Sequence, residues 1–482
     1  MNYDVIIIGG GLGGLTAGAK LAGEGWKVLL IEQHDRPGGC ATTFTRGDFT
    51  LEVGLHEMDG PSPGDMKSRI FNELGVPGNV EFIRVPEFYR FVNDHLDIVV
   101  PHDPAGAMNV LGREFPGETD GIQAFFDQIL NPKRKSGQNT GINEPSLGEF
   151  LDSIIRDEDL KLVLLGNLGY FHDDPYSISL KYYSVAQGSY YKGAASYIKG
   201  GSQKLSDHLA DFIRNHHGTV LLNHLVTGIV AEGNKIMGVT YRKKKTSSAE
   251  VISAFADEII ANAALPNLAE LIGGESGAGI NEVISHQKPG ASLLTVYFGF
   301  RRSLRAIGNK HYSTFIFDGS VKTQADILEN NKSDFSSRSF TFVDYGQIDS
   351  GLAAGGKSVG AVCCIDYLSS WEHLSRAEYK KRKEEAAKIF IRRLEKLIPG
   401  ITAEIEYYEA GTPATVKRYT LNPGGAVYGF AQVPGKPPVN VSGIFDNLHI
   451  ASAWGNTGGG FSGAIFGGFL CAINILRKRK SA

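Results

Sequence analysis

The sequence predicts an α/β protein with at least two domains. The chain has 482 residues, which is too many for one hydrophobic core. A short apolar strand, a glycine-rich turn and a helix pattern occupy residues 5–22, and a second strand follows at 27–31. A strand, a glycine turn and an apolar helix pattern occur again at residues 447–476. This repetition predicts one domain assembled from both ends of the chain.

The first unit has the order of elements that binds the pyrophosphate of an adenine dinucleotide. Residues 5–8 suit a strand buried on both faces, and Gly9-x-Gly11-x-x-Gly14 follows directly. These glycines permit a tight turn, close approach of the backbone to a phosphate, and close packing of the next helix. The helix start would direct free N–H groups at the pyrophosphate. Glu32 ends the second strand, where an acid accepts from ribose hydroxyls. The alternative to dinucleotide binding is an ordinary βαβ turn, which does not explain Glu32 at the end of the second strand.

Composition excludes several other classes of function. A hydrophobic content of 42%, a charged content of 21% and a net charge of −3 are ordinary for a soluble globular protein, so no nucleic-acid partner is expected. The four cysteines form no C-x-x-C pair and no zinc spacing with histidine, so no metal site is expected. So few cysteines are compatible with a reducing compartment, and we expect a cytoplasmic protein.

The C-terminal segment leaves two interpretations open. The apolar stretch at 463–476 is about 14 residues long, which is too short to span a bilayer. The basic tail at 477–480 follows it directly. This tail is either a solvated helix end, where cations suit the helix dipole, or a point of peripheral contact with an anionic membrane surface.

The middle of the chain carries the second domain. Residues 133–144 are polar and are expected to form a loop. Residues 178–197 are rich in tyrosine, which indicates either packing at a domain junction or the wall of an apolar pocket. Helix patterns occur at 122–130, 147–155, 205–215 and 376–397, and strand patterns at 219–222, 225–231, 236–241, 256–261, 292–300, 340–343 and 359–366.

Further motifs extend over most of the chain. They are the run from Gly38 to Phe44 (GGCATTF), the segment Val53-Gly54-Leu55-His56, the Gly-Gly-x-x-x-Leu element at 200–205, Ala261-Asn262-Ala263, Gly411-Thr412-Pro413, the segment from Gly425 to Gly429, and the run 450–463. In this order and spacing, the chain resembles the phytoene desaturase-like flavoproteins, and within them the branch of carotenoid isomerases and retinol saturases. One departure is at Ala453-Trp454, where many members carry an acidic residue.

The resemblance implies that the dinucleotide is FAD rather than a nicotinamide. The implied fold is a Rossmann-like, glutathione reductase-type FAD-binding domain made of residues 1–75, 197–265 and 440–482. An α+β substrate-binding domain with a helical part then covers 76–196 and 266–439. The predicted cofactor contacts are Gly9, Gly11, Leu12, Gly13, Gly14, Glu32, Gly38, Gly39, Cys40, Val226, Ala453 and Gly460.

Hydride chemistry at a flavin requires few catalytic side chains. The flavin ring carries out the hydride step, and the protein positions the substrate and excludes water from the site. His56 and Glu57 are the candidates for a proton donor or acceptor, and a structural histidine is the alternative for His56. We expect an FAD-dependent oxidoreductase that desaturates, saturates or isomerises a hydrophobic isoprenoid or polyene. The alternatives are an amine-oxidase-like flavoenzyme acting on a soluble polar substrate and a non-catalytic flavin-binding protein. A buried lysine and paired aromatics beside the flavin would favour the amine-oxidase-like enzyme. Trp454 is expected to face either the flavin or the substrate.

Overall fold

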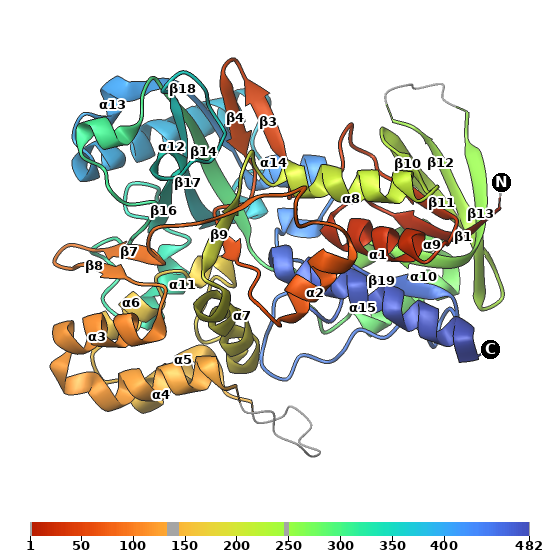
Figure 1. Ribbon diagram of the computed structural model, residues 1–482, viewed down its shortest axis with the longest axis horizontal. Coiled ribbons are helices and arrows are strands. Elements are labelled where there is room, and N and C mark those ends of the chain that lie inside the picture. Colours follow the sequence, from red (N-terminus) through yellow and green to blue (C-terminus); the bar gives the residue numbers. More distant parts are fainter. Residues whose placement is uncertain (1, 133–143, 245–249, 482) are drawn as a thin grey trace.

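The computed structural model describes residues 2–132, 144–244 and 250–481, and it confirms the predicted α/β class. Two sheets of seven strands each dominate the structure, and helices pack on both (Figure 1). The predicted loop at 133–144 lies outside the described residues except for Glu144.

The first sheet is built from three distant parts of the chain. Its central strands run in the order β10-β2-β1-β13, all parallel, and β19 pairs in parallel with the end of β13. The antiparallel strands β12 and β11 extend the sheet from the start of β13. The strands are β1 (Asn2–Ile8), β2 (Val28–Ile31), β10 (Thr219–Leu221), β11 (His224–Glu232), β12 (Lys235–Lys243), β13 (Ile252–Ala261) and β19 (Leu448–Ile450). Ala261 pairs with both Ile8 and Ile450, so the two chain ends finish at one edge of the sheet.

Alternation along β1 explains why both faces of this sheet are covered. Val5 and Ile7 pack into the core shared with α1 (Leu12–Gly23), α8 (Gln203–Asn215) and α15 (Gly460–Ser481). Ile6 and Ile8 pack into a second core with α9 (Leu265–Ile272) and α10 (Gly274–Val283). Successive side chains of a strand point to opposite faces, so a continuous apolar run suits a sheet with helices on both sides.

Glycine residues allow the N-terminal helix α1 to contact the C-terminal strand β19 and helix α15 closely. A Cβ atom on Gly13 would lie 1.7 Å from the carbonyl oxygen of Ala451, at the end of β19. A Cβ atom on Gly468 of α15 would lie 2.1 Å from the carbonyl oxygen of Gly13. Such approaches admit no side chain, so α1 and α15 pack backbone to backbone, and Figure 1 shows the two helices side by side with both termini at the same end of the molecule.

Helix α15 is longer than the apolar stretch of about 14 residues predicted from the sequence. It has 22 residues because the helix begins at Gly460, before that stretch, and continues through the basic residues after it. By length and composition alone it is the one helix, in the part of the chain that the structure describes, that is long and apolar enough to cross a membrane. In the fold, its Phe469 and Ala472 are buried in the core shared with α1.

The second sheet has the order β18-β14-β17-β16-β15-β7-β8. Its strands are β7 (Tyr89–Val92), β8 (Asp97–Val100), β14 (Ser292–Phe300), β15 (Ser313–Ile316), β16 (Phe340–Asp344), β17 (Ser358–Asp366) and β18 (Ile405–Gly411). Helix α12 (Arg376–Leu397) covers one face with Ala386, Phe390 and Leu394. A group of helices lies at the other side, at the lower left of Figure 1: α3 (Pro104–Glu114), α4 (Thr119–Leu130), α5 (Leu147–Ile154), α6 (Glu158–Leu164) and α7 (Leu180–Gly193).

Shorter elements complete the two parts of the molecule. They are the hairpin β3 (Thr43–Arg46) and β4 (Phe49–Glu52), the three-stranded sheet β5 (Met58–Asp59), β9 (Ala195–Ile198) and β6 (Phe82–Arg84), and the helices α2 (Met66–Glu73), α11 (Ile327–Asn330), α13 (Ile401–Glu404) and α14 (Pro413–Thr420). Every strand of the first sheet falls within 1–75, 197–265 or 440–482. Helices α9 and α10 follow that boundary but pack on the first sheet. The division into domains stays a prediction.

The close contact between the chain ends predicts that a side chain at position 13 destabilises the fold. Gly13→Ala is expected to lower the melting temperature by about 5 °C or more, because the new methyl group collides with a backbone oxygen that cannot rotate away. Gly112→Ala in α3, where a Cβ atom meets nothing within 4 Å, is the control, and it is expected to leave the melting temperature unchanged or slightly raised. Equal melting temperatures for the two variants would contradict the close packing. Scanning calorimetry provides the measurement.

Candidate functional site

The glycine turn after β1 exposes the start of α1. Gly10 donates its N–H to Glu32 Oε2 at 2.7 Å, and the N–H of Gly9 is bonded to the carbonyl of Ile31 at 2.9 Å. Helix α1 begins at Leu12, and its N-cap, Gly11, supplies no side-chain hydrogen bond. The first-turn N–H groups of a helix have no partners within the helix, so this end of α1 offers main-chain donors to an anion.

A second glycine segment lies against the first. Gly38 donates its N–H to the carbonyl of Gly10 at 2.7 Å, and its φ of +122° is a conformation that favours glycine. A Cβ atom on Gly39 would lie 3.4 Å from the Cα atom of Gly11. The two segments therefore form a cradle of main chain that lacks side chains. The pyrophosphate of a dinucleotide fits such a cradle at a helix start.

The acid at the end of β2 is bound on both oxygens. Besides Gly10, the N–H of His34 donates to Glu32 Oε1 at 2.7 Å. Val226 in β11 lies two residues after His224, whose N–H donates to the carbonyl of Glu32 at 2.9 Å. The structure thus places Val226 beside the end of β2. Asn262 was missed as a site residue, and its Nδ2 donates to the carbonyl of Gly9 at 3.1 Å, which braces the glycine turn.

The C-terminal glycine turn joins the site from the other side. A Cβ atom on Gly429 would lie 2.2 Å from the carbonyl oxygen of Ala453, so residues 452–459 pack tightly on the segment that contains Tyr428. Gly460 begins α15 with a φ of +75°. The prediction for Trp454 is wrong: it is 2% exposed and packs edge-on against Phe430 at 4.9 Å between ring centroids, within the core on the far face of the first sheet.

Five side chains from separate segments are enclosed by the fold without being fully buried. Burial raises the pKa of Cys40 to about 11 and that of Tyr182 to about 12, and it lowers the pKa of His56 to about 4. Burial also raises the pKa values of Tyr170 and Tyr428. All five nevertheless keep part of their surface accessible. We call the region around these five residues the reaction space.

The walls of the reaction space are aromatic and uncharged. The thiol groups of Cys363 and Cys40 and the phenol of Tyr182 are the electrostatic neighbours that add to the raised pKa of Tyr428. The ring of His56 lies 5.7 Å from that of Tyr170, centroid to centroid. Both interpretations of the tyrosine-rich segment apply, each to different residues. Four of its tyrosines are buried in the core: Tyr183, Tyr190, Tyr191 and Tyr197. Tyr182 instead belongs to the reaction space.

Glu57 is a buried carboxyl without a partner. The residue is 6% exposed, and neither carboxyl oxygen accepts or donates a hydrogen bond within the described part of the chain. Burial raises the pKa of Glu57 well above its usual value, and the nearby Glu87 carboxyl raises it further. Glu57 therefore keeps its proton over a pH range in which an exposed glutamate is ionised. Tyr190 and Tyr312 donate their hydroxyls to the main chain of Glu57 and His56, which fixes this segment.

Two carboxylates fix the ends of the segment that carries His56 and Glu57. Glu52 accepts from the N–H and the hydroxyl of Ser202, at 2.7 and 2.6 Å, and from the hydroxyl of Tyr197 at 3.2 Å. Asp59 pairs with Lys67, which is 1% exposed, and accepts from Ser462 in the first turn of α15. Sequence reasoning missed these residues. The signal for Glu52 was an acid in an otherwise apolar strand, but its partners lie 145 to 150 residues away.

Comparison with known proteins agrees with this geometry. The family model described as flavin containing amine oxidoreductase matches residues 12–476. Prolycopene isomerase of Daucus carota is 26% identical over 522 aligned residues, covering 98% of this chain and 80% of that protein. All-trans-retinol 13,14-reductase of Danio rerio is 24% identical, covering 89% of this chain and 77% of that protein. These relatives are of the two kinds that the sequence motifs predicted.

Solved structures support the fold. An oxidoreductase from Methanosarcina mazei superposes with a TM-score of 0.69 at 17% identity, covering 99% of this chain and 100% of that one. Cyclohexylamine oxidase from Brevibacterium oxydans superposes with a TM-score of 0.65 at 17% identity over the full length of both chains. The family match spans nearly the whole chain, and the glycine cradle fits the cofactor that the family name implies. The chain belongs to the flavin-containing amine oxidoreductase family and is an FAD-dependent oxidoreductase.

Proposed function

We propose that the enzyme acts on carbon–carbon double bonds of a hydrophobic isoprenoid or polyene, as a desaturase, a saturase or an isomerase. The observation that carries this proposal is the neighbouring pair His56 and Glu57, whose burial shifts both pKa values toward the uncharged form, beside the ring of Tyr170. A site that favours uncharged forms suits the entry of an apolar chain, because a fixed charge there would have to be desolvated. The relatives named prolycopene isomerase and all-trans-retinol 13,14-reductase support this substrate class.

FAD would be held by Gly9 to Gly14, Glu32, Gly38 to Cys40, Val226, Ala453 and Gly460, and when bound it supplies two-electron transfer. The chain's own contribution is position, exclusion of water and one proton. In a saturation, one alkene carbon receives a hydride and the other receives a proton, and the protonated Glu57 is the group suited to give that proton. In a desaturation the same carboxylate takes the proton back. The uncharged ring of His56 lies beside the reaction space.

A second candidate function has an observation in its favour. Tyr182 and Tyr428 both border the reaction space, and such a pair would suit the amino group of an amine-oxidase-like reaction on a polar substrate. A flavin-binding protein without turnover is the third candidate.

The cytoplasmic location stays a prediction, as does peripheral membrane contact through α15. The exposed Leu470, on α15, and the exposed Arg477 near its end support contact with a membrane. Against it, Lys478 donates to the carbonyl of Asp446, and Arg479 lies over the ring of Trp26 at 4.6 Å. Two of the basic residues therefore have contacts within the protein.

Anaerobic absorbance spectroscopy tests the three candidates together. The bound flavin is first reduced chemically, and all-trans-retinol, a carotenoid or a primary amine is added separately to the oxidised and reduced protein. We expect a change of flavin redox state, or a change in the double-bond pattern of the product, with a polyene. Bleaching of the oxidised flavin by the amine alone would overturn the proposal in favour of the second candidate. No response to any of the three would favour the non-catalytic one.

Glu57→Gln is expected to slow turnover about 100- to 10,000-fold while FAD content stays normal. The amide has nearly the same shape as the carboxyl group, but it is too weak an acid to donate a proton to the substrate. Glu270→Gln, at an exposed position of α9, is the matched control and is expected to leave turnover unchanged. Steady-state rates and the flavin absorbance per protein measure both properties. A Glu57→Gln enzyme with normal turnover would remove Glu57 from the mechanism.

The raised pKa of Glu57 also predicts how stability depends on pH. A carboxyl whose folded pKa is raised stabilises the fold fully below its unfolded pKa and loses that contribution as pH rises toward the folded pKa. Glu57→Gln is therefore expected to raise the melting temperature relative to wild type, and more at pH 9 than at pH 5. A difference between the two proteins that is the same at both pH values would contradict the buried, protonated carboxyl.

Glu32→Gln is expected to weaken FAD binding about tenfold or more, because one of its two acceptor oxygens becomes an N–H donor that faces main-chain N–H groups. The dissociation constant is measured by titrating the deflavinated protein with FAD and following the quenching of flavin fluorescence. Glu270→Gln serves again as the control. Unchanged affinity in Glu32→Gln would show that Glu32 does not contact the cofactor.

A further inference from the structure

A buried polar cluster joins three distant parts of the chain. Its members are Asp59 in β5, Lys67 in α2 and Ser462 in the first turn of α15, and we call them the Asp59 cluster. Lys67 is 1% exposed, and its Nζ pairs with Asp59 Oδ2 and lies 3.4 Å from Ser462 Oγ. Ser462 donates its hydroxyl to Asp59 Oδ1 at 2.5 Å. A cation and a hydroxyl therefore satisfy the two carboxylate oxygens of Asp59, as a buried carboxylate requires.

The Asp59 cluster links the proposed proton donor to the predicted cofactor site. Asp59 lies two residues after Glu57, and Ser462 lies two residues after Gly460, which begins α15 and is a predicted contact of FAD. Helix α15 packs on both α2 and β5. The bond from Ser462 to Asp59 is therefore a side-chain link between the segment that carries Glu57 and the start of α15.

Other contacts hold the same segment to the second sheet and to α7. Three successive carbonyl groups accept tyrosine hydroxyls: Leu55 from Tyr345 at 2.9 Å, His56 from Tyr312 at 2.5 Å and Glu57 from Tyr190 at 3.3 Å. Tyr345 directly follows β16, Tyr312 directly precedes β15, and Tyr190 lies on α7. These tyrosines place the segment relative to the second sheet and α7, whereas Ser462 places it relative to α15.

The carboxyl group of Glu57 depends on this main chain for its position. Neither of its oxygens has a hydrogen-bond partner within the described residues. The course of the main chain and the packing around it therefore determine where the carboxyl lies. Proton transfer requires the donor and the acceptor at hydrogen-bond distance, and a misplacement of about 1 Å can cost about 100-fold in rate. A contact that fixes the segment relative to the cofactor site thus contributes to the rate without touching the substrate.

We infer that Ser462 is a positioning residue, which acts through Asp59 to hold Glu57 in place relative to the start of α15. The inference rests on the proposed function, in which Glu57 donates the proton and FAD is held at that helix start. The hydroxyl of Ser462 is directed to Asp59, so it serves the reaction through another residue rather than by contact with the substrate. Lys67 completes the arrangement, because it fixes the carboxylate that receives the hydroxyl.

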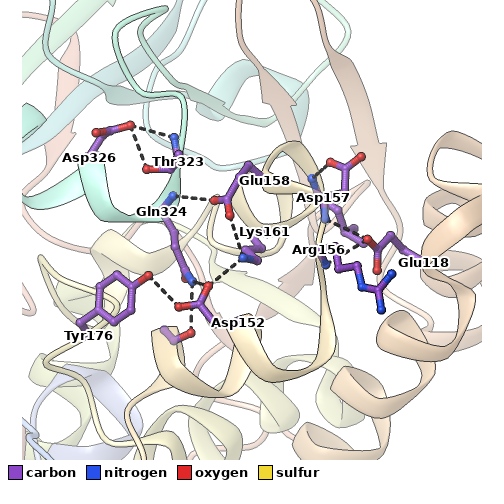
Figure 2. Close-up of polar contacts among 12 residues, drawn as sticks. Glu118, Asp152, Arg156, Asp157, Glu158, Lys161, Tyr176, Thr323, Gln324 and Asp326 are labelled. Atoms are coloured by element: carbon purple, nitrogen blue, oxygen red, sulfur yellow. Dashed lines mark hydrogen bonds and ion pairs between the residues drawn. The ribbon is translucent and has the colours of Figure 1, made fainter.

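A second cluster of the same chemistry, shown in Figure 2, provides a matched control. Tyr176 donates its hydroxyl to Asp152 Oδ2 at 2.9 Å. Asp152 Oδ1 accepts from Lys161 Nζ at 2.7 Å, and the side chain of this lysine is 5% exposed. Gln324 Nε2 donates to the same oxygen at 2.7 Å, so the cluster joins α5 and α6 to the segment before α11. Ser462→Ala and Tyr176→Phe each remove one hydroxyl from an aspartate that is paired with a buried lysine.

Steady-state kinetics of the FAD-loaded protein with a polyene substrate provide the first measurement. Ser462→Ala is expected to lower kcat about tenfold, while KM and the dissociation constant of FAD change by less than about twofold, because the lost contact positions a proton donor and does not bind the substrate. Ser462→Thr, which keeps the hydroxyl, is expected to keep kcat within about threefold of wild type. Tyr176→Phe is expected to leave all three quantities unchanged.

Infrared titration of Glu57 provides a second measurement, which needs no substrate. The band of its protonated carboxyl is assigned by its loss in Glu57→Gln, and the pH dependence of the band gives the pKa. In Ser462→Ala the loosened segment is expected to admit water to the carboxyl, so its raised pKa falls toward the usual value, and Tyr176→Phe is expected not to change it. The neighbouring titratable groups are the same in both variants: His56, Asp59, Glu87, Tyr170, Tyr190, Tyr312 and Tyr345.

An unchanged kcat or an unchanged Glu57 pKa in Ser462→Ala would overturn the inference, as would an equal change in Tyr176→Phe. Absence of polyene turnover by wild type would instead overturn the proposed function, and the infrared titration would still decide the role of Ser462. If Ser462→Ala loses its FAD or its fold, Ser462→Cys replaces it, because a thiol is a weaker donor of similar size. A kcat and a Glu57 pKa in Ser462→Cys equal to those of Ser462→Thr would then count against the inference.

Discussion

The architecture depends on a contact that only backbone atoms can make. Gly13 lies so close to Ala451 and Gly468 that no side chain fits between them, and this contact joins α1 to the last strand and the last helix. Other glycines of the cradle also lie in close contact: a Cβ atom on Gly14 would lie 2.3 Å from the carbonyl oxygen of Gly9, and one on Gly38 would lie 2.2 Å from that of Ala41. Tight main-chain packing at the edge of the first sheet therefore closes the domain and also fixes the two glycine segments of the cradle.

The reaction space shows how a fold can hold titratable groups away from their usual charge states. Burial shifts the pKa of Glu57 upward and that of His56 downward, and both shifts favour the uncharged form of the side chain. Leaving the Glu57 oxygens without partners costs stability. The surrounding contacts compensate, since Glu52 and Asp59 fix the segment at its two ends. Residues of this kind concentrate at functional sites, where stability is exchanged for reactivity.

Much of the first domain could be predicted because its signals are local. The glycine turn, Glu32 and the apolar strands at each end stand within a few residues of one another, and their periodicity is unambiguous. The short strands β7, β8 and β15 were missed because three or four residues of mixed polarity carry little pattern. The ion pair of Asp59 with Lys67 and the bond to Ser462 were missed because the last partner is 403 residues away. The length of α15 was underestimated because hydropathy does not mark where a helix ends.

The composite first sheet has a consequence for biosynthesis. Strand β1 precedes its neighbour β13 by some 250 residues and β19 by some 450. At about 5 to 20 residues per second, synthesis of these intervals takes roughly 10 to 50 s and 20 to 90 s. Until β13 has been made, β1 can pair only with β2, which later pairs with β10. The edge of β1 that pairs with β13 is therefore unpaired during this interval, and the first sheet is assembled in full only after β19 has been made.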